Sequence, residues 1–148
     1  MAYIYELEYT VHSVIENLDD AGLPEGEPEI SITTSEGFLK VSEERTVISY
    51  AEATDGGKVT TDITVEGGAI TLSRRGAVVF DATFKEGEAC NTVYSVPPYS
   101  FDTAIKTKRA SSGITKAGGE LRLLYSMNIG GQEKSVRLKI SAKPKARA

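Results

Sequence analysis

The sequence predicts an all-β protein, an antiparallel meander that closes into a β-barrel of about eight to ten strands. Ten segments alternate apolar and polar residues in the two-residue period of a half-buried strand. Tight-turn signals rich in glycine separate these segments about every ten residues from 45 to 88. A sandwich is the alternative architecture. We favour the barrel because every strand has one polar face and because closure removes exposed sheet edges.

The first strand is expected over residues 3–15, with tyrosine and aliphatic side chains on one face. An acidic stretch rich in proline and glycine follows, and we expect residues 17–29 to form a mobile loop. The second strand region covers residues 30–41. We expect this strand to bend at Gly37 through a β-bulge.

The middle of the chain predicts four strands joined by hairpins. They cover residues 47–52, 59–65, 70–75 and 77–84. Gly76 permits the turn conformation that β-branched residues resist. Arg74 shares its strand face with Ile70 and Leu72, so the alternation points one guanidinium into the barrel mouth.

The last third of the chain predicts four more strands, over residues 89–94, 101–107, 121–129 and 136–140. Pro97 and Pro98 are expected to interrupt pairing and form a corner. Residues 143–148 form a basic tail that we expect to fray.

The length of the chain predicts one domain spanning residues 1–148. Residues 1–66 hold 15 acidic and 3 basic side chains, whereas residues 67–148 hold 6 acidic and 14 basic ones. Such asymmetry can mark a nucleic-acid surface, here Lys106, Lys108 and Arg109. We favour a simpler interpretation, in which the acidic first strand pairs with the basic last strand and promotes closure. We therefore expect no nucleic-acid partner, while a homodimer stays open.

The chain shows no leader and no apolar run long enough to cross a bilayer, so we expect neither export nor membrane insertion. A single cysteine, Cys90, cannot form an internal disulfide, which suits a reducing compartment. The cytoplasm is the expected location.

The sequence offers little for catalysis. His12 is the only histidine and Cys90 the only cysteine, which leaves no basis for a nucleophile–base pair or a zinc site. The acidic residues 16–20 lack the alternating oxygen ligands of a calcium loop. We expect no metal, no cofactor and no enzyme activity.

The strongest candidate site lies on the inner strand faces. Its proposed ligand-binding residues are Tyr50, Glu52, Arg74, Tyr94 and Tyr125. Buried tyrosine hydroxyls need partners, and together with one arginine they could orient a small anionic or amphipathic ligand inside the barrel. The alternative is a filled, purely structural barrel in which these groups satisfy one another. In that case the protein would act through its outer surface, as a homodimer or by contact with RNA.

Several short motifs resemble those of the YwiB-like family of small bacterial proteins. They are Gly37-Phe38-Leu39-Lys40, Ile48-Ser49-Tyr50-Ala51-Glu52, Leu72-Ser73-Arg74-Arg75-Gly76, Phe84-Lys85-Glu86-Gly87 and Leu138-Lys139-Ile140. The resemblance runs from about residue 30 to the end of the chain. It implies a calycin-like barrel, similar to lipocalins, in a bacterial cytoplasm, and it implies no particular activity. Residues 94–100 depart from the family pattern, with a second proline, Pro98, and with Ser100 in place of glycine.

Overall fold

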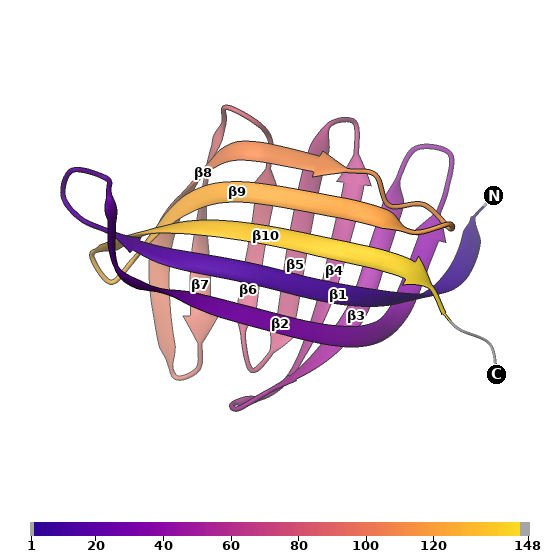
Figure 1. The fold of residues 1–148 in the computed structure, drawn as a ribbon, viewed down its shortest axis with the longest axis horizontal. Helices are drawn as coiled ribbons and strands as arrows, with labels where there is room; N and C mark the ends of the chain where they lie inside the picture. The colour runs from indigo at the N-terminus through magenta and orange to yellow at the C-terminus, as the bar shows by residue number, and fades with distance from the viewer. Residues whose placement is uncertain (1, 146–148) are drawn as a thin grey trace.

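The computed structural model describes residues 2–145 as a closed antiparallel barrel of ten strands (Figure 1). The strand order around the barrel is β1-β10-β9-β8-β7-β6-β5-β4-β3-β2. The strands are β1 (Tyr3–Leu18), β2 (Pro24–Val41), β3 (Thr46–Thr54), β4 (Gly57–Glu66), β5 (Ala69–Gly76), β6 (Val79–Phe84), β7 (Ala89–Val96), β8 (Tyr99–Ser112), β9 (Gly119–Ile129) and β10 (Gln132–Pro144). The predicted all-β meander and its closure are therefore confirmed.

The barrel is flattened into two layers. In Figure 1, β8, β9, β10, β1 and β2 lie side by side and cross steeply over β3 to β7. The inward residues of both layers form one core, because successive side chains of a strand point to opposite faces. Core residues that are at most 2% exposed include Tyr9, Leu39, Ile48, Ile63, Ile70, Phe84, Ile105, Leu123 and Ile140.

The seam between β1 and β10 carries the charge complementarity that the sequence predicted. The two strands pair from Leu7 and Pro144 to Asn17 and Lys134. Lys143 Nζ lies 3.1 Å from Glu8 Oε1 on β1, and Lys145 Nζ, just after β10, lies 3.7 Å from Glu6 Oε2 on β1. These exposed pairs each contribute little energy, but opposite charges across neighbouring strands favour this closing register.

The expected loop at 17–29 is wrong, because most of this segment is strand. β1 continues to Leu18 and β2 begins at Pro24, so only residues 19–23 connect them. Asp19 stabilises this short turn, since its Oδ1 accepts hydrogen bonds from the backbone N–H groups of Ala21 and Leu23. Prolines are tolerated in β2 because its far side is a sheet edge, where no ladder hydrogen bond is required.

The bulge expected at Gly37 is also wrong. β2 runs in regular register through Gly37 on both β1 and β3, and its pairing with β1 shifts instead between Ile15 and Asn17. Position 37 requires glycine for a different reason: a Cβ there would lie 2.1 Å from the Ser49 carbonyl oxygen. The neighbouring strand and the Tyr9 ring pack directly against the glycine backbone.

The turns follow the sequence signals with one exception. Gly76 has φ +114° at the end of β5, as its turn position requires. Pro97 and Pro98 do not interrupt the sheet at a corner, since they form the two-residue connection of the β7–β8 hairpin. Of the expected frayed tail, Lys143 and Pro144 belong to β10, and residues 146–148 lie outside the described part of the chain.

Candidate functional site

A single cross-strand row brings five inward residues together, and three of them belong to the predicted site. Tyr50 on β3 lies opposite Thr61 on β4, which lies opposite Arg74 on β5. Arg74 in turn faces Phe80 on β6, and Phe80 faces Tyr94 on β7. Directly opposed residues in an antiparallel sheet lie about 5 Å apart, so this row places one guanidinium among aromatic rings.

Arg74 on β5 forms an ion pair with Glu52 on β3, over the inner face of the intervening strand β4. Its Nη2 lies 3.7 Å from Glu52 Oε1, and the two side chains are 28% and 10% exposed. The distance exceeds that of a hydrogen bond, so the contact leaves the guanidinium N–H groups free of Glu52. The second carboxylate oxygen of Glu52 accepts a hydrogen bond from the Thr33 hydroxyl, which links β3 to β2.

Each of the three tyrosines predicted to bind a ligand packs against another aromatic ring. The Tyr50 ring packs 5.7 Å from Tyr9, whose hydroxyl donates a 2.9 Å hydrogen bond to the Phe38 carbonyl oxygen. Tyr94 meets Phe80 edge to face at 5.3 Å. Tyr125, on β9 in the opposite layer, packs 4.7 Å from Phe84. These contacts fix the rings, because offset and edge-to-face pairs are favourable geometries.

All five predicted site residues line one cavity of about 270 Å³ between the two layers. Its polar lining consists of Ser13, Glu29, Tyr50, Glu52, Arg74, Tyr94, Tyr125 and Lys134. Its apolar lining consists of Val11, Ile15, Leu72, Phe80, Met127, Ile129, Val136 and Leu138. The barrel is therefore not completely filled, and the cavity is lined by polar and apolar residues in equal number, so that it offers both an apolar wall and groups that can orient a small molecule.

Glu29 and Lys134 are cavity residues that the sequence analysis missed. The sequence predicts a loop at Glu29, whereas in the structure Glu29 lies on the inward face of β2 opposite Ile15. Lys134 precedes Val136 by two positions, so extending the alternation of β10 would have found it. Its Nζ donates a 2.7 Å hydrogen bond to Asn17 Oδ1, whereas Arg74 belongs to the tyrosine row itself.

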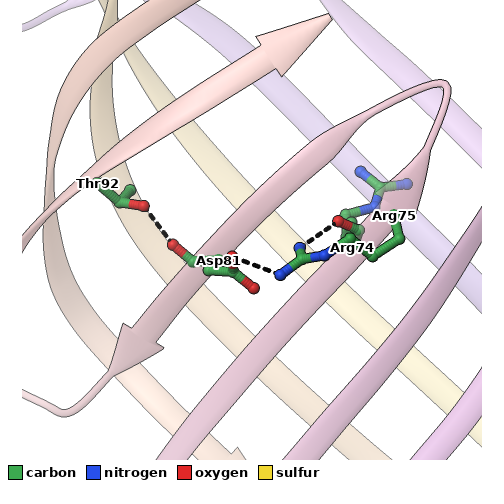
Figure 2. A network of polar contacts seen from close by, with 4 residues as sticks. All are labelled: Arg74, Arg75, Asp81 and Thr92. Carbon is green, nitrogen blue, oxygen red and sulfur yellow. Dashed lines mark hydrogen bonds and ion pairs between the residues drawn. The ribbon is translucent and has the colours of Figure 1, made fainter.

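Arg75 points away from this site and belongs to an outer network (Figure 2). Its Nη2 donates a 2.8 Å hydrogen bond to Asp81 Oδ2, and its Nη1 donates to the Arg74 carbonyl oxygen at 2.7 Å. The Thr92 hydroxyl donates to the Asp81 carbonyl oxygen, which connects β7 to β6. The hydrogen bond from Arg75 lowers the pKa of the Asp81 carboxyl. Two adjacent arginines thus have different environments, one facing the cavity and one exposed.

Burial raises the pKa of the hydroxyls of Tyr9, Tyr50 and Tyr125 above the ordinary value of 10.0. The nearby Glu52 carboxylate raises the pKa of Tyr50 further, while the Arg74 charge opposes this shift. Arg74 also lowers the pKa of Tyr125, in opposition to burial. The Arg74 charge therefore acts on two tyrosines from opposite layers of the barrel.

We expect three of the seven tyrosines to resist ionisation in the folded protein. The native state retains protons that the unfolded chain loses above pH 10.0, so stability is unaffected below that pH and falls as the pH rises beyond it. Tyrosinate absorbance followed together with circular dichroism measures this. Tyr50→Phe should reduce the resistant group to two, and ionisation of all seven tyrosines without unfolding would contradict the expectation.

Other groups considered from the sequence lie outside the cavity. His12 follows the outer face of β1 opposite Lys139, and Cys90 is half-buried on β7. Lys106, Lys108 and Arg109 are exposed on β8, where the pairing with β9 shifts register. Among residues 2–145, no group of three or more histidine, cysteine or acidic residues could hold a metal ion. The described chain also contains no helix able to cross a membrane.

The fold and the cavity define a ten-stranded antiparallel β-barrel protein with a partly polar interior pocket. The chain belongs to the family described as Domain of unknown function (DUF1934), which matches residues 23–140. It is 28% identical over 130 residues to the uncharacterized β-barrel protein YwiB of Bacillus subtilis (strain 168), covering 86% of this chain and 87% of that protein. The crystal structure of YwiB from Bacillus subtilis matches with a TM-score of 0.81 and 26% identity, covering 97% of this chain and 94% of that chain. These findings confirm the resemblance to the YwiB-like family.

Proposed function

We propose that this protein binds a small ligand that carries an anionic head and an apolar body within the barrel cavity. The observation that carries the proposal is the position of Arg74 in the cavity lining, in the same cross-strand row as Tyr50 and in the layer opposite Tyr125, with an ion pair that lacks a hydrogen bond. A guanidinium offers a planar fork of donors that matches a carboxylate or phosphate. The apolar wall around Leu72, Met127 and Val136 would cover the ligand body.

Glu52 would compete with the ligand anion for Arg74. Because Glu52 is also held by the Thr33 hydroxyl, it can stay in place when the ligand head takes the unused N–H groups of the guanidinium. Tyr50 and Tyr94 carry hydroxyls that can donate to the same head, since burial keeps Tyr50 protonated. We propose binding without turnover, because His12 and Cys90 do not line the cavity.

Octanoate, 1-octanol and octylammonium have the same eight-carbon chain and differ in the charge of the head group, so they test whether the cavity prefers an anionic head. We expect titration calorimetry to show octanoate binding most tightly, because only its head is anionic and can accept a pair of charge-assisted hydrogen bonds from Arg74. Arg74→Gln should weaken octanoate binding about 10- to 100-fold, the loss expected for a hydrogen bond to a charged group. The affinity for 1-octanol should change much less.

Arg75→Gln is the matched control, since it removes the same charge from the neighbouring position on the outer face. It should leave octanoate binding unchanged. The proposal fails if the wild-type protein does not bind octanoate, if it binds the three probes equally, or if the two arginine variants weaken binding to the same extent.

A further inference from the structure

β2 is paired on both sides only at its C-terminal end. It pairs with β1 from Pro24 to Val41, but with β3 only from Gly37 to Val41. No strand within residues 2–145 pairs with the other side of residues 24–36, and Figure 1 shows this part of β2 at the border of its layer. The barrel therefore exposes a row of unpaired backbone donors and acceptors, which can template pairing with another strand.

The unpaired edge is protected over one half only. Residues 24–29 carry two prolines and three glutamates, features that discourage edge pairing. Residues 30–35 contain neither proline nor charge. Here Ile30 and Ile32 are 60% and 65% exposed on the outer face, and Ile30 lies opposite Val14 of β1. Large exposed apolar side chains beside an open edge indicate a contact surface.

We propose that a second copy of this chain pairs with this edge, antiparallel and about a two-fold axis at Ser31. Each Ile30 then lies opposite Ile32 of the other copy, and each Glu29 lies opposite Thr33. Like charges directly opposite each other destabilise a strand pair, and this register places no glutamate opposite another. Shifting the two-fold axis to Pro28 would instead place Glu27 of one copy directly opposite Glu29 of the other. Among registers that keep the glutamates apart, only the axis at Ser31 places every isoleucine opposite an isoleucine.

The interface would border the cavity but does not depend on a ligand. Glu29 lines the cavity, and Thr33 hydrogen-bonds Glu52 across the gap between β2 and β3. The Thr33 contact holds this part of β2 close to β3 without using the backbone groups of the edge. An isologous pair of this kind is closed, because both copies use the same surface. Its formation is therefore testable with the protein alone.

A disulfide trap measures the register. In a Cys90→Ser background, Ser31→Cys places one thiol opposite its own copy on the two-fold axis, and mild oxidation should produce a covalent dimer. Ser111→Cys, an exposed serine on β8, is the matched control and should stay mainly monomeric. Equal cross-linking of the two variants would overturn the proposal.

Sedimentation equilibrium measures the association of the whole chain. We expect a reversible dimer, with Ile32→Glu raising its dissociation constant at least about tenfold while circular dichroism and the unfolding midpoint stay close to wild type. A wild-type protein that stays monomeric at the highest soluble concentration would overturn the proposal. A dimer unaffected by Ile32→Glu would place the interface elsewhere.

Discussion

Replacing Phe84 by alanine is expected to lower the free energy of unfolding by about 3–5 kcal/mol, as for other fully buried phenylalanines. Phe84 is 0% exposed, pairs with Ile70 across β5 and β6, and packs 4.7 Å from the Tyr125 ring. Its removal leaves a void that the surrounding strands cannot fill without breaking register. Urea denaturation with linear extrapolation measures the loss.

Phe38→Ala is the matched control for this prediction. Phe38 is 52% exposed on the outer face of β2, and its carbonyl, which accepts from Tyr9, is retained in the variant. We expect this variant to lose about 1 kcal/mol or less. Equal losses for the two phenylalanines would show that the packing around Tyr125 contributes little to stability. Because Tyr125 also lines the cavity, Phe84→Ala should in addition weaken octanoate binding.

Replacing Gly37 by alanine is expected to lower the free energy of unfolding by about 3 kcal/mol, at the upper end of the range for overpacked cores. The added Cβ would lie 2.1 Å from the Ser49 carbonyl oxygen and 3.0 Å from the Tyr9 ring. The atom that clashes belongs to the backbone and not to a flexible side chain. To remove the clash, β2 and β3 must therefore separate at Gly37 and Tyr50, where their pairing begins.

Gly113→Ala controls for the change in backbone entropy. The nearest heavy atom to its added Cβ, the Glu120 carbonyl oxygen, is an ordinary 3.7 Å away. We expect its stability to change by less than about 1 kcal/mol. A Gly37→Ala variant as stable as Gly113→Ala would show that the two strands can separate at no cost. Both variants are compared by urea denaturation under the same conditions.

The architecture could be predicted from the sequence because period-two alternation and glycine turns are local signals. Ten expected strands correspond to ten observed strands, and Arg74 points inward as its neighbours Ile70 and Leu72 indicate. The segment 17–29 was misassigned because proline and glutamate are typical of loops, and only tertiary context allows them on an edge strand. Gly37 was identified as special, but its cause is a contact with Ser49 that no local pattern encodes.

The candidate site was predictable as a set of inward residues but not as a cavity. Alternation placed Tyr50, Arg74 and Tyr94 on inner faces, and register then placed Arg74 between Thr61 and Phe80. The empty volume depends on how the two layers cross, which pairs residues far apart in the chain. The open edge of β2 could not be predicted either. It arises because the pairing between β2 and β3 ends at Gly37 and Tyr50, which is a long-range feature of the fold.

The topology of the ring has a consequence for how the chain reaches its native state. Every strand pair joins consecutive strands except β1 with β10, which joins Leu7 to Pro144. Hairpins between consecutive strands can form early from local contacts, whereas this last pairing must wait for nearly the whole chain. During synthesis, β1 would therefore expose one edge until β10 becomes available, and its apolar face would need protection from aggregation over that interval. The edge of β1 is covered only when β10 pairs with it.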